Sequence, residues 1–126
     1  MRELGLILAA MTLVSCSRPA SAPGSDFAQL TAGRVAGPPQ TCISTDQSSG
    51  LRAVDEQTLA YGSGRTVYIN RLAGPCPGVQ PLGTLIIEVQ GTQYCRGDRV
   101  RGREIGSIIA GPTCILENWV PYRRQP

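Results

Sequence analysis

The sequence predicts an all-β fold, a small disulfide-bonded barrel or sandwich of about six short antiparallel strands. From residue 41 onward, short apolar runs are separated at regular intervals by glycine and proline, which is typical of small all-β domains. No stretch shows convincing helical periodicity. Four cysteines are spread through the same region: Cys42, Cys76, Cys95 and Cys114. We expect a closed or nearly closed barrel, because closure removes exposed strand edges.

The expected strands lie at residues 51–61, 65–72, 84–90, 93–96, 99–103 and 113–120. The first two flank Gly62-Ser63-Gly64, which indicates a hairpin connection. The proline-rich segment at 74–78 cannot continue a strand and is expected to be a loop. Residues 84–90 form the most apolar strand, and alternation places Leu85, Ile87 and Val89 on its inward face. In the last strand, Trp119 is expected to pack in the core.

The first fifteen residues have the layout of an export signal, with a positive start, an apolar run and then small residues. The run is too short to cross a bilayer as a helix, which needs roughly 20 residues. It closes on Leu13-Val14-Ser15-Cys16, which resembles the lipobox at which bacterial lipoprotein precursors are lipidated and cut. We therefore expect Cys16 to become the first residue and to carry acyl chains. The alternative, cleavage of an ordinary secreted protein after Ala22, is disfavoured by Pro23.

Three segments follow from this pattern. Residues 1–15 are expected to be a lipoprotein signal peptide, residues 16–40 a lipidated N-terminus and disordered tether, and residues 41–126 a single β-domain. The tether is rich in Pro, Ala, Ser and Gly, a composition that cannot bury a core. Ser17 after the lipidated cysteine resembles lipoproteins sorted to the outer membrane. The expected location is therefore the cell envelope, at the periplasmic face of the outer membrane, with the membrane as a partner through the lipid.

The charged residues exclude several classes of function. The net charge is +3, all 12 basic residues are arginines, and the chain has no histidine. Without histidine and lysine, a Ser-His or Cys-His nucleophile pair, a Schiff base and a histidine metal ligand are excluded. So mild a positive balance does not indicate nucleic-acid binding. We expect no enzymatic activity, no cofactor and no metal.

The five cysteines become an even set once Cys16 is assigned to lipid. In an oxidising compartment the other four predict two disulfides. A four-thiolate zinc site usually shows close Cys-x-x-Cys pairs, and the chain has none. Four cysteines allow three connectivities. Of these we favour Cys76 with Cys95, bridging neighbouring strands, and Cys42 with Cys114, tying the ends of the domain.

The segment from Arg96 to Arg103 is the most conspicuous polar feature. On a strand, Arg99, Arg101 and Arg103 share one face because side chains alternate. Together with Arg96 they form a candidate site for phosphate or carboxylate groups on an envelope protein or an anionic glycan. The alternative is a solvated face that keeps an edge strand from pairing with another chain. Asp98 is expected to cap a tight turn after Gly97.

A second polar feature lies near the carboxyl end. Tyr122-Arg123-Arg124 combines an aromatic ring with two positive charges. If it is exposed, such a surface is typical of a protein interface, where tyrosine and arginine are enriched.

The cysteines and the residues around them also resemble a known type of protein. The motifs are Cys42, the segment from Asp55 to Thr58, Tyr68-Ile69-Asn70-Arg71-Leu72, Cys76-Pro77, Cys95-Arg96-Gly97-Asp98-Arg99-Val100 and Cys114-Ile115-Leu116. In order and spacing they resemble an uncharacterised family of small four-cysteine secreted or lipid-anchored domains of Gram-negative bacteria. The chain departs from that family at Glu117 and Trp119, where glycine and then phenylalanine are usual. The family has no assigned activity, so the resemblance implies the fold and the envelope setting alone.

These observations predict a non-enzymatic cell-envelope lipoprotein, a tethered periplasmic module that binds an unidentified ligand or has a structural role. The alternative is an inhibitor of a host or competitor enzyme such as lysozyme. It is suggested by Ser63-Gly64-Arg65 with Tyr68, which resembles the loop of small lipid-anchored lysozyme inhibitors.

Overall fold

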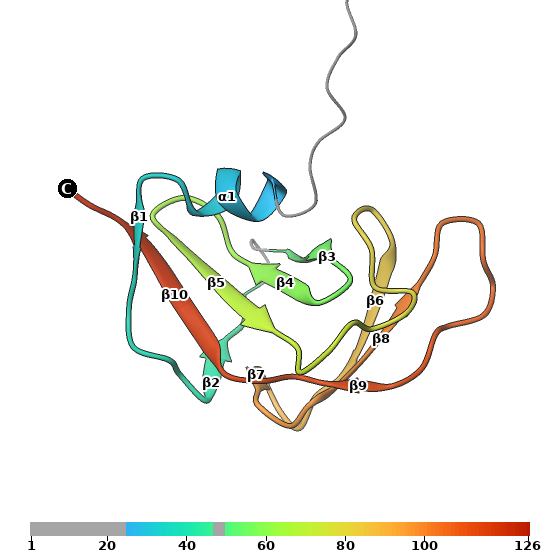
Figure 1. Cartoon of the computed structure of the whole chain (residues 1–126). Coiled ribbons are helices and arrows are strands. Elements are labelled where there is room, and N and C mark those ends of the chain that lie inside the picture. Colours follow the sequence, from blue (N-terminus) through green and yellow to red (C-terminus); the bar gives the residue numbers. More distant parts are fainter. Residues whose placement is uncertain (1–24, 47–49) are drawn as a thin grey trace, which may run out of the picture.

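The computed structural model describes residues 25–46 and 50–126, and it shows one short helix followed by ten strands (Figure 1). The helix, α1, spans Ser25–Thr31. The strands are β1 Arg34–Ala36, β2 Cys42–Ser44, β3 Leu51–Asp55, β4 Thr58–Tyr61, β5 Thr66–Arg71, β6 Thr84–Glu88, β7 Gln93–Cys95, β8 Arg99–Arg103, β9 Cys114–Ile115 and β10 Trp119–Arg124. The predicted all-β class is confirmed.

The strands form three antiparallel sheets. The largest has the order β1-β10-β5-β4-β3, the second pairs β2 with β7, and the third has the order β6-β8-β9. The sheets are not closed, so the expected barrel closure is wrong. The main sheet keeps β1 and β3 as its edges. β1 is only three residues long, and a very short edge strand is another way to limit edge-to-edge pairing.

The strand boundaries agree best with the prediction where turn residues mark them. The hairpin across Gly62–Gly64 joins β4 to β5 as predicted, and β8 has the predicted bounds. The expected strand at 51–61 is instead two strands, because the Asp55 carboxylate accepts the Gln57 N–H at 2.8 Å and stabilises a tight turn. The expected strand at 113–120 divides into β9 and β10. Val89 lies beyond β6 and is 40% exposed, so its expected inward position is wrong.

The packed structure begins at α1, well before the expected domain boundary. A seven-residue helix is marginal by itself, so its stability comes from packing. Phe27 packs edge-to-face on Tyr122 at 6.0 Å, and the Arg71 guanidinium lies 4.5 Å from the Phe27 ring centroid. β1 then pairs with β10. The expectation of a disordered tether is therefore wrong for residues 25–40. The predicted signal peptide, Cys16 and the rest of the tether lie outside the described residues.

The main sheet is packed on both faces. On one face, Phe27 and Leu30 of α1 cover a buried cluster of Val54, Ala60, Val67 and Ile69. On the other, Trp119 is fully buried, as predicted, and stacks on Tyr94 at 6.4 Å. The core on that face also contains Ile43, Ala53, Leu59, Tyr61, Leu72, Cys76, Val79, Val100 and Leu116. This second core joins the main sheet to the two smaller ones.

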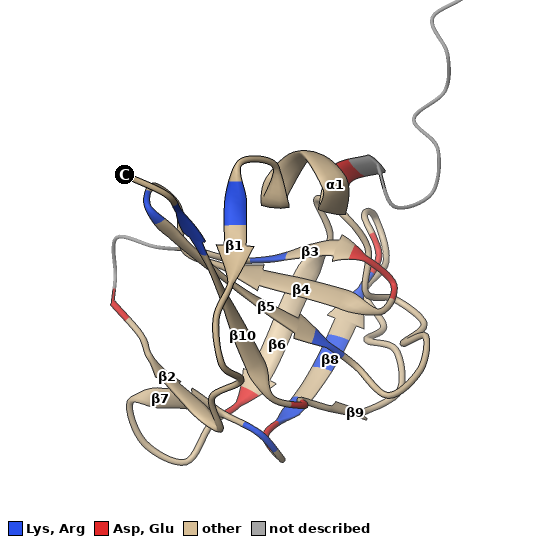
Figure 2. Ribbon diagram, turned by 60° about the vertical axis from the view of Figure 1, so that its left-hand side comes forward, with Lys and Arg blue, Asp and Glu red and all other residues tan. Residues whose placement is uncertain are grey.

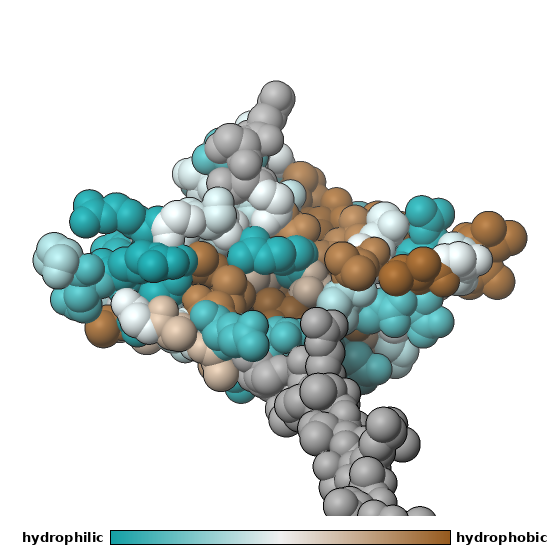
Figure 3. Space-filling view, turned by 90° about the horizontal axis from the view of Figure 1, so that it is seen from above, coloured by the Kyte–Doolittle hydropathy of each residue, from teal (hydrophilic) through white to brown (hydrophobic). Residues whose placement is uncertain are grey.

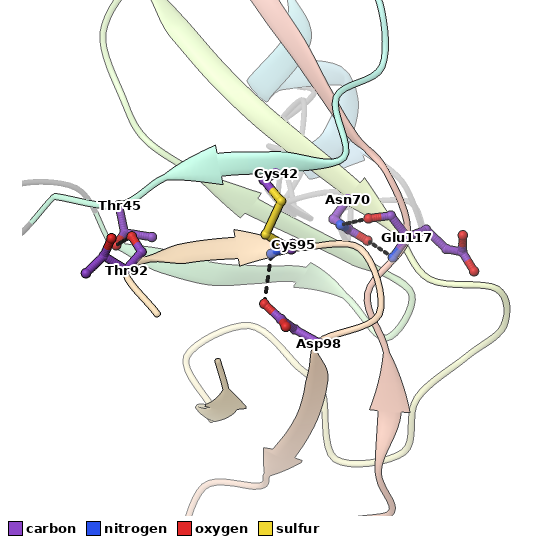
Figure 4. Close-up of a disulfide and its surroundings, with 7 residues drawn as sticks. All are labelled: Cys42, Thr45, Asn70, Thr92, Cys95, Asp98 and Glu117. Atoms are coloured by element: carbon purple, nitrogen blue, oxygen red, sulfur yellow. Dashed lines mark hydrogen bonds between the residues drawn. A yellow bond between two sulfur atoms is a disulfide. The ribbon is translucent and has the colours of Figure 1, made fainter. Parts of the chain in front are cut away.

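A buried amide fixes the chain between β9 and β10. Asn70 of β5 is fully buried, and its side-chain amide donates to the Glu117 carbonyl at 2.7 Å. Its side-chain oxygen accepts the Glu117 N–H at 3.0 Å (Figure 4). Both polar ends of the Asn70 side chain are thus satisfied, as a buried amide requires. The pair sets where β10 begins.

The two disulfides join Cys42 to Cys95 and Cys76 to Cys114, so the favoured pairing is wrong. Cys42 and Cys95 lie directly opposite each other in the β2–β7 pair, with their Cα atoms 4.0 Å apart (Figure 4). Cys76 is fully buried in the β5–β6 connection and reaches β9. The error has a physical cause: β7 pairs with β2, which lies outside the strands that were predicted from the sequence.

Three glycines allow the backbone to cross closely under the β8–β9 connection. A Cβ at Gly102 would collide with the backbone of Gly78 and Val79, and one at Gly111 would collide with the Pro77 carbonyl. The Gly111 N–H donates to the Gly102 carbonyl at 2.7 Å. The crossing holds the ends of the connection at residues 104–113 against the β5–β6 loop.

The disulfide connectivity is tested by mass mapping without reduction. Trypsin separates Cys42 in residues 35–52 and Cys114 in residues 104–123, and it leaves Cys76 and Cys95 together in residues 72–96. We expect all three peptides in one linked species. Further cleavage at Glu88 is expected to leave Cys76 linked to Cys114 and Cys95 linked to Cys42. An internally bridged 72–96 peptide would restore the rejected pairing.

The glycine crossing predicts a position-specific effect of a single methyl group. Gly102→Ala is expected to destabilise the domain by about 1–3 kcal/mol, the usual range for overpacking. Denaturant unfolding followed by Trp119 fluorescence measures the change. Gly74→Ala is the control, because its Cβ meets nothing within 4 Å, and it is expected to stay within about 0.5 kcal/mol of the wild type. Equal effects of the two substitutions would contradict the crossing.

Candidate functional site

The predicted arginines lie on the third sheet and in the turn before it. In β8 the arginines alternate with the buried residues Val100 and Gly102, so Arg99, Arg101 and Arg103 share the outward face. The Arg99 guanidinium lies 3.7 Å from the Glu88 carboxylate. The Arg101 Nε donates to the Gly111 carbonyl at 3.0 Å. Arg99 thus links β8 to β6, and Arg101 links β8 to the loop that follows it. Both arginines therefore help to hold the third sheet together.

Arg96 and Asp98 belong to the turn that joins β7 to β8. Arg96 lies 3.4 Å from the Glu117 carboxylate, and the Arg96 side chain is exposed while the Glu117 side chain is half-buried. Ion pairs as exposed as this one contribute about 0–1 kcal/mol. Asp98 accepts the Cys95 N–H at 2.8 Å, so the predicted capping of this turn is confirmed (Figure 4). The Arg96-Gly97-Asp98 tripeptide thus has a local structural use.

A hollow of about 550 Å³ lies beside this turn. It is lined by two carboxylates, Glu88 and Asp98, together with Arg99. Glu88 faces Arg99, and the Asp98 carboxylate holds the turn. Both acids therefore have structural partners, and the hollow offers no pair of free carboxylates for acid–base chemistry.

Within residues 25–46 and 50–126, no group of three or more metal-ligating side chains comes together. In the same part of the chain, α1 is neither long nor apolar enough to cross a bilayer.

A second group of arginines gathers at one end of the main sheet. Its members come from the start of β1, from β3, from the β4–β5 hairpin and from the end of β10. We call this group the arginine edge: Arg34, Arg52, Arg65, Arg123 and Arg124. In Figure 2 the basic segments of β1, β3 and the C-terminal end lie at the same end of the main sheet. The Tyr122-Arg123-Arg124 motif pointed to part of this surface, but nothing local in the sequence indicates the other three arginines.

Backbone carbonyls hold three members of the arginine edge together. Arg34 lies directly opposite Arg124 in the β1–β10 pair, where Cβ atoms are about 4.5–5.5 Å apart. The Arg34 guanidinium and the Arg124 N–H both donate to the Arg65 carbonyl, each at 2.9 Å. Arg52 donates to the Gly62 carbonyl, also at 2.9 Å. These bonds orient the Arg34 and Arg52 side chains and leave other guanidinium N–H groups for a ligand.

The charge of the arginine edge is barely compensated. The ion pairs found in the described part of the chain are Arg96–Glu117 and Arg99–Glu88, and neither includes a member of the edge. Partial burial lowers the pKa of the Arg34 guanidinium, and the positive charges of Arg124 and Arg52 lower it further. One acid, Asp26 of α1, lines a shallow hollow together with Arg52 and offsets some of the charge.

Like charges opposite each other across two strands destabilise a sheet. The arginine edge therefore lowers the stability of the free domain, and a bound anion would relieve the repulsion. A guanidinium matches the planar geometry of carboxylate and phosphate groups through paired hydrogen bonds. The arrangement is suited to binding an anion.

Comparison with known proteins found no matching family model, no similar curated protein and no solved structure of similar fold. The functional argument therefore depends on the geometry of the chain.

Proposed function

We propose that this protein is a non-enzymatic, lipid-anchored module of the cell envelope that binds an anionic envelope component. One observation carries the proposal. Five arginines from four separate segments converge on one end of the main sheet, and none of them has an acidic partner in the described structure. This arginine edge, rather than the arginines of β8, is the proposed binding site.

The arginine edge is built on a stable framework. Its strands belong to the main sheet, which is packed on both faces. A site on paired strands is held more precisely than one on a loop. The Arg34 and Arg52 side chains are already oriented by carbonyl groups, so less side-chain entropy is lost on binding. Multiple phosphate or carboxylate groups on one ligand would engage several arginines together.

The anchoring part of the proposal comes from the sequence. The Leu13–Cys16 motif supports lipidation of Cys16, and Ser17 supports the periplasmic face of the outer membrane. The two disulfides are compatible with an oxidising compartment outside the cytoplasm. Two or more acyl chains give stable anchoring where one chain does not. Anchoring raises the local concentration of the domain at the envelope, so a modest affinity is sufficient.

A second candidate function is inhibition of a host or competitor enzyme such as lysozyme. The observation that favours it is the exposure of Ser63, Gly64 and Arg65 at the tip of the β4–β5 hairpin. A protruding tip of this kind can enter a substrate cleft. Inhibition of lysozyme at micromolar concentrations, lost when Arg65 is changed to alanine, would favour this function. An unaffected lysozyme rate removes it.

The arginine edge is tested with two triple variants of equal net charge. R34Q/R52Q/R124Q removes three charges from the edge, and R96Q/R99Q/R103Q removes three from the β8 region. Titration with fluorescein-labelled heparin, a polymer of sulfate and carboxylate groups, measures the affinity. We expect the edge variant to bind roughly tenfold more weakly than the control variant, since a hydrogen bond to an ionised group contributes about 1.5–3 kcal/mol.

Arg101 stays unchanged in the control variant because it donates to the Gly111 carbonyl and supports the fold. Circular dichroism and the unfolding midpoint establish that both variants are folded. Equal losses in the two variants would mean that only net charge matters, and a larger loss in the control would return the site to β8.

Lipidation is tested by the intact mass of the protein extracted from membranes. We expect a chain that begins at Cys16 and carries the added mass of acyl groups. Cys16→Ser is expected to abolish both the added mass and the membrane fraction. A chain that begins at Pro23 without lipid refutes the anchor and leaves the arginine edge as a separate question.

A further inference from the structure

Two loops of the third sheet expose large apolar side chains. The β8–β9 loop carries Ile105, Ile108 and Ile109, which are 68%, 91% and 76% exposed. The β5–β6 loop carries Leu82, which is 92% exposed. Single exposed apolar residues are common, but a contiguous group marks an interaction surface. Leu82 also has a φ of 64°, which is unusual for a residue with a Cβ, and such outliers concentrate at functional sites.

The two apolar loops lie at the same end of the third sheet. Thr84 at the start of β6 pairs with Arg103 at the end of β8. Leu82 precedes Thr84 by two residues and Ile105 follows Arg103 by two, so both lie at the same end of this strand pair. In Figure 1 both loops, yellow and orange, rise toward the side of the molecule that carries α1. We call Leu82, Ile105, Ile108 and Ile109 the apolar loops.

Arg34, Arg52 and Arg124 of the arginine edge belong to this same side. Pro81, next to Leu82, lines a shallow hollow together with Asp26, Leu30 and Arg52, so the β5–β6 loop, α1 and the edge are contiguous. Figure 3 shows this side from above: hydrophilic residues gather toward the left, where the C-terminal end lies in Figure 1, and hydrophobic residues project at the right. One side of the domain thus offers both positive charge and apolar surface.

The chain also enters the packed domain on this side, because α1 is its first element (Figure 1). If Cys16 carries the anchor, eight residues separate it from Ser25. A fully extended chain advances at most about 3.3–3.6 Å per residue, so Ser25 lies within about 30 Å of the membrane surface. The tether is therefore shorter than the sequence predicted, and it keeps the α1 side close to the bilayer.

We propose that the α1 side of the domain lies flat on the anchoring membrane, with the arginine edge on the phosphates of anionic phospholipid headgroups and the apolar loops inserted into the interface. This inference rests on the proposed function, because it needs the anchor at Cys16. It names the anionic component as the lipid surface itself. We favour a bilayer as the occupant because this side of the domain has both positive charge and exposed apolar side chains. A membrane interface has the matching pair, negative headgroups and an apolar interior.

A membrane interface presents negative charge at the headgroups and apolar material about 5–10 Å deeper, which is the depth that interfacial segments reach. Basic residues near an anionic leaflet are attracted to it, and exposed isoleucines gain by leaving water. A soluble polyanion would satisfy the arginine edge but would leave Ile108 and Leu82 in water. The lipid surface accounts for both.

The test places a tryptophan at Ile108 or at Gln90 in the full lipidated chain. Both positions are exposed, and Gln90 lies past the opposite end of β6 from Leu82. The chain is reconstituted into vesicles of phosphatidylcholine and phosphatidylglycerol, with or without brominated phosphatidylcholine as a quencher. We expect I108W to be quenched roughly twofold more than Q90W and to emit at shorter wavelength, because only residue 108 reaches the interface.

Two further arms identify the cause of the quenching. Vesicles of phosphatidylcholine alone, or the R34Q/R52Q/R124Q background, are expected to reduce the quenching of I108W to the level of Q90W. The native Trp119 is fully buried and provides a constant background that also reports folding. Should I108W disturb the loop, I105W is the second probe of the same loop.

The outcomes separate this inference from the proposed function. Equal quenching of I108W and Q90W, with heparin binding still lost in the edge variant, overturns the membrane-facing orientation and leaves an anion-binding module. Equal quenching of I108W and Q90W, together with an unchanged heparin affinity of the edge variant, overturns both the membrane-facing orientation and the proposed anion-binding function. A third outcome is that an added envelope protein shifts the emission of I108W to shorter wavelength while brominated lipid does not quench it. That outcome would assign the apolar loops to a protein partner and contradict the inference.

Discussion

The pairing of β10 with β5 is the interaction on which the rest of the structure depends. Five residues of β10, from Trp119 to Arg123, lie opposite five residues of β5. The same strand delivers Trp119 to the core and Arg123 and Arg124 to the arginine edge. β1 then adds to its free side and brings Arg34 opposite Arg124. A single strand near the C-terminus therefore links the packing of the domain to its proposed function.

The start of β10 is fixed from inside the molecule. Asn70 bonds both the N–H and the carbonyl of Glu117, two residues before the strand. Trp119 follows, fully buried, and its Nε1 has no hydrogen-bond partner in the described structure. An unsatisfied buried N–H is costly, typically about 1–3 kcal/mol. The apolar contacts of the Trp119 ring must outweigh that cost for the position to be stable.

The apolar loops depend on a different constraint. The Cys76–Cys114 disulfide and the crossing of Gly78, Gly102 and Gly111 fix both ends of the β8–β9 connection. The loop tip is thereby held away from the core, although it contains three isoleucines. A flexible loop of this composition would lose its exposed apolar surface by folding back. The fixed stem keeps that surface exposed.

The sequence predicts features that local patterns determine. Alternation and turn residues identify β8, the β4–β5 hairpin and the all-β class, and the size and apolar character of Trp119 predict its burial. The disulfide pairing, the packing of α1 and the arginine edge depend on contacts between distant segments. Arg34 and Arg124 meet only because β1 pairs with β10, and Cys42 meets Cys95 only because β2 pairs with β7. No local period in the sequence carries that information.

The central claim is that one side of the domain, which contains α1, the arginine edge and the apolar loops, rests on an anionic membrane. Hydrogen–deuterium exchange of the full lipidated chain, in vesicles with and without phosphatidylglycerol, tests it most directly. The account predicts slower exchange with the anionic lipid at residues 104–110 and 80–83, and unchanged exchange in the turn at residues 90–92. Equal exchange in the two kinds of vesicle, or protection centred on residues 90–92, would contradict it.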